Sequence, residues 1–111
     1  MNGASQEFAE QFGANLLRLR RRAGLSQEDL CARSGLHRTE IGLLENARRV
    51  PRGDTIAKLA GSLGVDPADL FTDISWVPAL DRPAGNIWTR LASVRQAQDR
   101  AKARKPAADG H

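Results

Sequence analysis

The chain has 111 residues, 41% of them hydrophobic and 27% charged, with a formal net charge of +4. This length accommodates one small domain, whose modest stability a partner chain would raise. Because Cys31 is the single cysteine, an intramolecular disulfide and a cysteine-rich zinc site are excluded. The sequence shows neither a secretory signal nor an apolar run of about 18 residues. We therefore expect a cytoplasmic protein without a membrane anchor.

Apolar side chains recur at helical spacing through the first 71 residues, which predicts a string of short helices. The first helix covers about residues 7–23, with Phe12, Leu16 and Leu19 on one stripe, and Gly24 ends it. The second helix covers residues 27–34. Its predicted N-cap is Ser26, with Asp29 three residues later as the acid of a capping box, and Gly35 follows as a left-handed turn residue.

The third helix is expected over about residues 38–46. After a proline-containing loop, Asp54 is the expected cap of a fourth helix, which Gly64 ends. Asp66 caps a last turn that begins with Pro67, and Leu70 and Phe71 then close the core. Since no alternating strand pattern with hairpin glycines occurs in this region, the predicted fold is all-α.

Two short helices joined at a glycine-bearing turn form a helix-turn-helix, which places its second helix in the major groove of DNA. The inward and turn positions of this arrangement fall on Leu30, Cys31, Gly35, Leu36, Ile41 and Leu44. The open side carries His37, Arg38, Thr39, Gly42 and Leu43. These side chains are available to a groove.

The fragments GLSQEDL, SGLHRTEI and LEN, followed by LAGSLGVDPADLF, resemble the Cro/phage-repressor type of helix-turn-helix domain, the xenobiotic response element family. The resemblance covers about residues 12–71 and implies a five-helix, lambda-repressor-like DNA-binding domain, which we place at residues 1–73. It further implies a homodimer on a palindromic operator in double-stranded DNA. The resulting expectation is a transcriptional repressor associated with the nucleoid, with no enzymatic activity and no cofactor or metal.

The family's functional positions transfer to this sequence residue by residue. The positions that would contact bases are Arg38, Thr39, Gly42 and Leu43. The positions that would contact phosphates are Gln27, His37, Asn46, Arg48, Arg49 and Arg52. The resemblance also implies an ion pair between Arg20 and Glu45.

Three positions depart from the family's pattern or from what a groove helix favours. Ala47 stands where the family has a glycine, so either the helix runs past it or alanine adopts a strained left-handed conformation. Gly42 lies inside the helix, where it either lets the backbone approach DNA or is simply tolerated. Glu40 repels phosphate but can accept a hydrogen bond from cytosine.

Several residues have a simple structural explanation beside a functional one. Cys31 fits inert packing better than a redox role, and His37 serves as a helix cap with or without a phosphate contact. The RLRRR run at residues 18–22 is compatible with a solvated helix face. No nucleophile with a neighbouring base, metal cluster or phosphate loop supports an enzyme.

Residues 74–111 form a C-terminal arm outside the family resemblance, and they hold the whole net charge, with seven basic and three acidic side chains. An extended stretch carries the apolar residues Ile74, Trp76, Val77 and Leu80. A helix over about residues 87–102 follows, capped by Asn86 and with Ile87, Trp88, Leu91 and Val94 on one stripe. The polar stretch at residues 96–111 is expected to be frayed or disordered at its end.

Three roles are open for this arm. It either forms a dimer or covers the domain, binds a partner protein through residues 76–94, or grasps DNA with its basic end. The second role would make the protein an antitoxin or adaptor.

Overall fold

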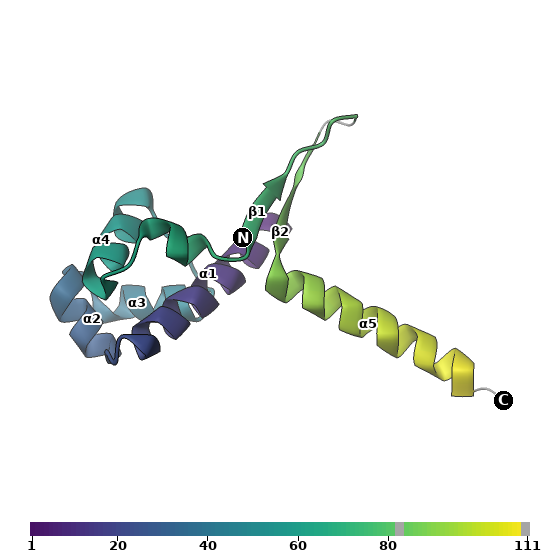
Figure 1. Ribbon diagram of the computed structural model, residues 1–111, viewed down its shortest axis with the longest axis horizontal. Coiled ribbons are helices and arrows are strands. Elements are labelled where there is room, and N and C mark those ends of the chain that lie inside the picture. Colours follow the sequence, from purple (N-terminus) through teal and green to yellow (C-terminus); the bar gives the residue numbers. More distant parts are fainter. Residues whose placement is uncertain (82–83, 110–111) are drawn as a thin grey trace.

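The computed structural model describes the backbone of residues 1–81 and 84–109, and it confirms a helical domain followed by an arm (Figure 1). The domain consists of α1 (Gly3–Arg22), α2 (Gln27–Ser34), α3 (Arg38–Glu45), α4 (Gly53–Leu63) and the short 3-10 helix η1 (Pro67–Phe71). The arm consists of β1 (Ile74–Val77), β2 (Asn86–Thr89) and α5 (Arg90–Asp109). No described helix has the length and apolar character needed to cross a membrane.

The predicted apolar stripes meet in one core between the helices of the domain. The fully buried side chains include Phe12, Leu16, Leu30, Ile41, Leu44, Leu59 and Leu70. Burial of one such side chain contributes about 1.5–3 kcal/mol. Cys31 is half-buried against this core, as packing alone would place it. Phe71 departs from the prediction because it remains 37% exposed, with its ring 5.9 Å from that of Phe8.

The predicted capping box at the start of α2 is confirmed. Ser26 Oγ accepts from the Asp29 N–H at 3.0 Å, and the Asp29 carboxylate accepts from the Ser26 N–H at 2.9 Å. The hydrogen bond from the Ser26 backbone is the main cause that lowers the pKa of Asp29. Because the pKa of Asp29 is lowered, the capping box stabilises the folded protein fully at pH values above the ordinary pKa of a carboxyl group. This stabilisation is lost as the pH falls through the lowered pKa.

Two other helix starts differ from the prediction. The proposed cap at Asp54 is wrong, because α4 begins at Gly53, two residues before the start that such a cap implies, and none of the described side chains caps it. Asp54 instead pairs with Arg52 Nε at 3.3 Å. At the other end of the domain, α1 begins at Gly3, four residues before the predicted start, because the Asn2 side chain accepts from the Ser5 N–H.

The helices α1, α3 and α4 end in the same Schellman arrangement. In each, a backbone N–H reaches back five residues: Leu25 to Arg20 O at 3.1 Å, Arg48 to Leu43 O at 2.8 Å, and Val65 to Ala60 O at 3.0 Å. The residue before each of these donors is left-handed: Gly24 with φ 73°, Ala47 with φ 59° and Gly64 with φ 70°. Thus α3 does not run through Ala47. Instead, alanine adopts the conformation that glycine takes in the other two helices.

We therefore expect Ala47→Gly to stabilise the protein by about 0.5–1 kcal/mol. Removal of the Cβ relieves a left-handed cost of about 1–2 kcal/mol, and the greater freedom of glycine in the unfolded chain offsets part of this gain. Urea unfolding measures the change. The reverse control is Gly35→Ala, which should lose about 1 kcal/mol because Gly35 has φ 75°. Equal stability of Ala47→Gly and the parent chain would contradict the strain.

The first three residues of the predicted C-terminal helix, 87–89, and its predicted cap form a strand. Asn86 is not a helix cap, because residues 86–89 pair antiparallel with β1, with Trp76 opposite Ile87 and Ser75 opposite Trp88. Thr89 takes over as the cap of α5, and its Oγ1 accepts from the Ala92 N–H at 3.2 Å. The helix then continues to Asp109, beyond its predicted end near residue 102 and into the end of the tail that we expected to be frayed or disordered. The expectation for residues 110–111 lies outside the described residues.

Two fully buried amide side chains of α1 attach the arm to the domain. Gln11 Oε1 accepts from the Leu91 N–H of α5 at 2.9 Å, and Gln11 Nε2 donates to Asn15 Oδ1 at 3.2 Å. Asn15 Nδ2 in turn donates to Leu70 O at 3.0 Å and Thr72 O at 2.8 Å. The base of the arm is therefore part of the domain's buried hydrogen-bond network.

Beyond this attachment, both parts of the arm extend away from the domain (Figure 1). The hairpin tip and the free end of α5 point in different directions. Arg95 pairs with Glu10 of α1, and all described side chains of α5 after it, to residue 103, are exposed.

Candidate nucleic-acid interface

The amino end of α3 stands open to solvent. His37, the N-cap, accepts the Thr39 N–H on its Nδ1 at 3.1 Å, which leaves Nε2 to carry the proton of the neutral ring. His37, Arg38 and Thr39 are all exposed, whereas Ile41 and Leu44 on the other face are fully buried. The helix is thus held by its apolar face and presents its first turn outward.

Acidic side chains of α2 and α3 pair with two of the predicted DNA-contacting arginines. Arg38 Nη1 lies 3.1 Å from Glu28 Oε1 of α2, and Arg49 pairs with Glu40 of α3. Glu40 therefore neutralises an arginine, a role that the sequence analysis did not consider. Because Arg38 and Glu28 are exposed, their pair contributes only about 0–1 kcal/mol and is readily exchanged for another anion.

Gly42 and Leu43, the other predicted base contacts, lie one turn further along α3 and are half-buried. A Cβ built on Gly42 would meet no atom within 4 Å. Packing within the described part of the molecule therefore gives no reason for glycine at this position. A close approach from outside, or simple tolerance, are the two explanations that remain.

A partly buried cluster fixes the carboxyl end of α3. Arg20 Nε lies 2.6 Å from Glu45 Oε2, Arg20 Nη2 lies 3.1 Å from Glu45 Oε1, and Arg20 Nη1 donates to Leu25 O at 2.8 Å. The hydrogen bond to Glu45 is the largest cause that raises the pKa of Arg20. Gln27 joins the cluster, since its Nε2 donates to Glu45 Oε1 at 3.0 Å. The predicted phosphate contact at Gln27 therefore has one amide donor already engaged.

The remaining predicted phosphate contacts follow α3. Asn46 is its C-cap, and its Nδ2 donates to Gly42 O at 2.9 Å. Arg48 is exposed and forms no ion pair with the described residues. Arg52 lies just before α4, and among the described side chains it pairs with Asp54 alone. The structure thus places these side chains along the segment from the end of α3 to the start of α4.

The sequence analysis missed Gly13 of α1, which sets how closely α1 and α3 approach. A Cβ on Gly13 would lie 2.6 Å from Leu44 O and 2.9 Å from Glu45 O. Both atoms belong to the backbone, so that a side chain would displace α3. A glycine in the middle of an amphipathic helix is the only sequence signal for such an approach, and it does not name the partner helix.

Comparison with known proteins also identifies a helix-turn-helix domain. The helix-turn-helix domain family matches residues 11–71. An uncharacterised HTH-type transcriptional regulator of Sinorhizobium fredii is 42% identical over 66 residues, which cover 60% of this chain and 86% of the relative. The crystal structure of a restriction-modification controller protein from Aeromonas hydrophila is 41% identical, with a TM-score of 0.56, and covers 57% of this chain and 96% of its own.

A second restriction-modification controller protein was solved as a tetramer in complex with its natural 35-base-pair operator. It is 25% identical, with a TM-score of 0.54, and the match covers 58% of this chain and 84% of the controller. Since the family match spans more than half of the sequence, the chain belongs to the helix-turn-helix family, in the Cro/phage-repressor type that its motifs resemble.

Proposed function

We propose that this protein is a sequence-specific DNA-binding transcriptional regulator, a dimeric cytoplasmic repressor that reads a palindromic operator on the nucleoid through the major groove. The observation that carries the proposal is the open amino end of α3, where Arg38 and Thr39 are exposed above a fully buried apolar face. An arginine at this place can donate two hydrogen bonds to guanine O6 and N7.

The phosphate contacts are proposed around that reading turn. His37 Nε2 points its proton away from the cap bond, and the first N–H groups of α2 offer a second anion contact beside Gln27. Arg48, Arg49 and Arg52 extend the positive segment beyond α3. The relative that was solved on its operator supports the use of this domain on duplex DNA.

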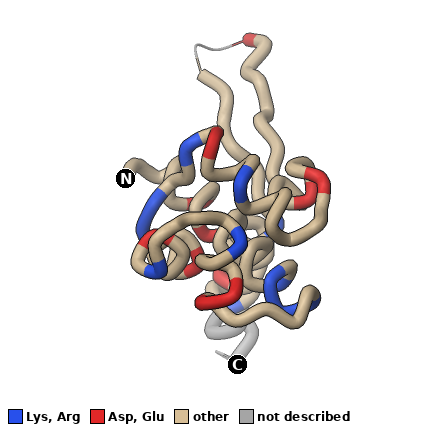
Figure 2. Tube along the Cα trace, turned by 90° about the vertical axis from the view of Figure 1, so that its left-hand side faces the viewer, with Lys and Arg blue, Asp and Glu red and all other residues tan. Residues whose placement is uncertain are grey.

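The arm is proposed to hold two copies together, with the domain boundary near residue 73. Between Asp73 and Arg90 the sequence has charged residues only at positions 81 and 82, and Figure 2 shows the hairpin stem without either sign of charge. Trp76 is 59% exposed on one face and Trp88 is 40% exposed on the other. A two-stranded hairpin with apolar groups on both faces is marginal in water unless another surface covers it.

The decisive experiment selects bound sequences from a random duplex pool and then compares variants on the selected site. We expect two half-sites about one helical turn, 34 Å, apart. Arg38→Ala should cost about 1–3 kcal/mol and relax the preference at one base pair, whereas Gln27→Ala should weaken all sequences alike and reduce the salt dependence of binding.

Arg33→Ala is the matched control, because Arg33 is an exposed arginine at the far end of α2 whose Nη1 donates to Ser62 O of α4. It should bind like the parent chain. Unfolding of the Gln27 variant is measured in parallel, since this substitution also removes the bond to Glu45. Unchanged binding of Arg38→Ala and Gln27→Ala to operator and random duplex would refute the placement of the groove helix.

A second candidate is an antitoxin or adaptor whose arm binds a partner protein, and the exposed hairpin favours it as well. Leu80, near the hairpin tip, is 94% exposed. Sedimentation of the purified chain separates the two candidates. A self-associated chain supports the dimeric repressor, whereas a monomer that copurifies with a specific protein supports the alternative. The relatives are named as regulators and controllers, and we propose no enzymatic activity.

A further inference from the structure

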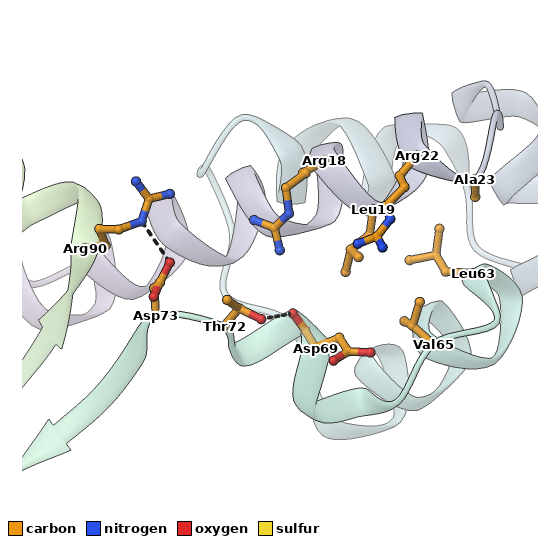
Figure 3. A pocket seen from close by; sticks show the side chains of 10 residues that line it. All are labelled: Arg18, Leu19, Arg22, Ala23, Leu63, Val65, Asp69, Thr72, Asp73 and Arg90. Carbon is orange, nitrogen blue, oxygen red and sulfur yellow. Dashed lines mark hydrogen bonds and ion pairs between the residues drawn. The ribbon is translucent and has the colours of Figure 1, made fainter.

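A cavity of about 850 Å³ lies between α1, η1 and the start of α5, on residues that no part of the proposed DNA interface uses. Its apolar lining comes from Leu19, Leu63 and Val65. Figure 3 shows Arg18 and Arg22 of α1 reaching over this lining from one side, with Asp69 and Thr72 on the other. Cavities of this size, placed where two structural units meet, are typical of small-molecule sites.

The acidic side chains of the cavity are already engaged within the protein. Asp73 Oδ2 accepts from Arg90 Nε at 2.8 Å, and Asp69 Oδ2 accepts from the Asp66 N–H at 3.2 Å. Arg18 Nη1 donates to a neutral partner, Asn15 Oδ1, at 3.0 Å. Within the described residues, neither Arg18 nor Arg22 has a carboxylate partner. The guanidinium groups of Arg18 and Arg22 are therefore not paired with the two carboxylates, of Asp69 and Asp73, that line the same cavity.

Arg18 and Arg22 are four residues apart on α1, so that two like charges lie one above the other on the same face. Successive residues of a helix are about 100° apart around its axis. Arg18 and Arg22, each two residues from Arg20, therefore lie about 160–200° around the helix from Arg20. Because Arg20 faces α3 through Glu45, the cavity lies on the side of α1 that is turned away from the groove helix. A duplex seated on α3 does not account for these two arginines.

We propose that this cavity binds a small organic anion. A carboxylate or phosphate group would lie between the guanidinium groups of Arg18 and Arg22, which match the geometry of such anions through paired N–H donors. An apolar body of the ligand would cover Leu19, Leu63 and Val65. Arg90, already paired with Asp73, brings the first residue of α5 to the edge of the same site.

The site is connected to the base of the arm. Arg18 donates to Asn15, and Asn15 holds the carbonyl groups at the end of η1 and the side chain of Gln11, which binds the Leu91 N–H. A bound anion that draws Arg18 away from Asn15 alters this network. An effect of this change on operator binding rests on the proposed function. The binding of the anion itself does not rest on it.

The test titrates the full-length chain, without DNA and at low salt, with benzoate and with inorganic phosphate, following backbone amide signals by NMR. Benzyl alcohol is the neutral counterpart of benzoate. We expect saturable shifts at Leu19, Arg22 and Val65 with benzoate but not with benzyl alcohol. Arg22→Met should weaken benzoate binding at least tenfold. Arg21→Met, the neighbouring exposed arginine that does not line the cavity, should leave it unchanged.

Absence of saturable shifts with both anions would overturn the site, as would equal losses in the Arg22 and Arg21 variants. A third result, in which Arg22→Met lowers affinity for random duplex and leaves benzoate binding intact, would assign Arg22 to a DNA contact and also overturn it. Since the titration contains no DNA, its failure is distinguishable from a failure of the operator experiment with Arg38→Ala.

Discussion

Glu45→Ala is expected to lower the free energy of unfolding by about 3–5 kcal/mol. The side chains of Arg20 and Glu45 are only 12% and 5% exposed, so that removal of the carboxylate leaves a guanidinium with two of its donors unpartnered in a nearly dry place. Gln27 loses its acceptor at the same time. A loss of this size is a large part of the total stability of a small domain. Urea unfolding followed by circular dichroism measures it.

Two further variants test whether the expected loss of stability comes from the unpaired buried charge of Arg20 and not from the loss of any carboxylate partner of an arginine. The double variant Arg20→Met, Glu45→Met removes both charges and should recover most of the loss, because apolar side chains of similar size replace buried ion pairs at little or no cost. Glu28→Ala removes an exposed partner of Arg38 and should cost less than about 1 kcal/mol. If Glu45→Ala and Glu28→Ala lost equal stability, the Arg20–Glu45 pair would not be the link that we describe.

The same cluster explains how α3 keeps its angle to α2. Glu45 lies at the end of α3, Gln27 at the start of α2, and Arg20 binds both Glu45 and Leu25 O in the connection between α1 and α2. One carboxylate thus holds the two helices of the helix-turn-helix to α1. Operator affinity of the double variant should remain below that of the parent chain even where its stability is restored, because methionine supplies no directional bond.

The sequence predicted the helix-turn-helix closely because its signals are local. Ser26 and Asp29 form a capping box within four residues, and Gly35 supplies a left-handed turn for which glycine is the natural choice. Such features depend on neighbours in the chain, so the bounds of α2 agree exactly with the prediction. Ala47 shows the limit: the sequence could pose the two alternatives, but the Schellman bonds decide between them.

The hairpin escaped prediction because its two strands are short and the segment between them is longer than a tight hairpin turn. ISWV and NIWT each have four residues, and eight residues separate them, with no tight Asn-Gly or Asp-Gly turn between them. Trp88 also fits a helical stripe with Leu91, and periodicity alone could not reject that interpretation. Two signals were available in the sequence. Each four-residue segment combines a tryptophan with β-branched residues, and the second segment ends in a threonine that can cap a helix.

The buried amides of α1 were missed for a different reason. Gln11 and Asn15 lie on a helix whose apolar stripe alone defined the predicted core, and polar residues of these types are usually exposed. Their partners, Leu70, Thr72 and Leu91, are 55 to 80 positions away. No local sequence pattern predicts a contact between residues so far apart in the chain. The candidate small-molecule cavity depends on the same long-range contacts and was equally hidden.

Asn15→Leu is expected to cost about 2–4 kcal/mol of unfolding free energy and to loosen the arm. Leucine has a similar volume but no polar atoms, so the substitution leaves Leu70 O and Gln11 Nε2 buried without their partner. Each unsatisfied buried group costs about 1–3 kcal/mol, and the added apolar burial recovers only part of this. Urea unfolding gives the global loss, and hydrogen exchange of the Leu91 amide reports the attachment of α5.

Gln6→Leu is the matched control, an amide-to-leucine change on the same helix. Gln6 is half-buried and its two hydrogen bonds, to Glu10 and Ala47 O, are long at 3.3 and 3.4 Å, so that its loss should stay below about 1 kcal/mol. The Leu91 amide should exchange faster in Asn15→Leu than the lower global stability explains, but not in Gln6→Leu. Equal protection of this amide in both variants would mean that the arm is held by the hairpin's contacts with α1 and not by the buried amides.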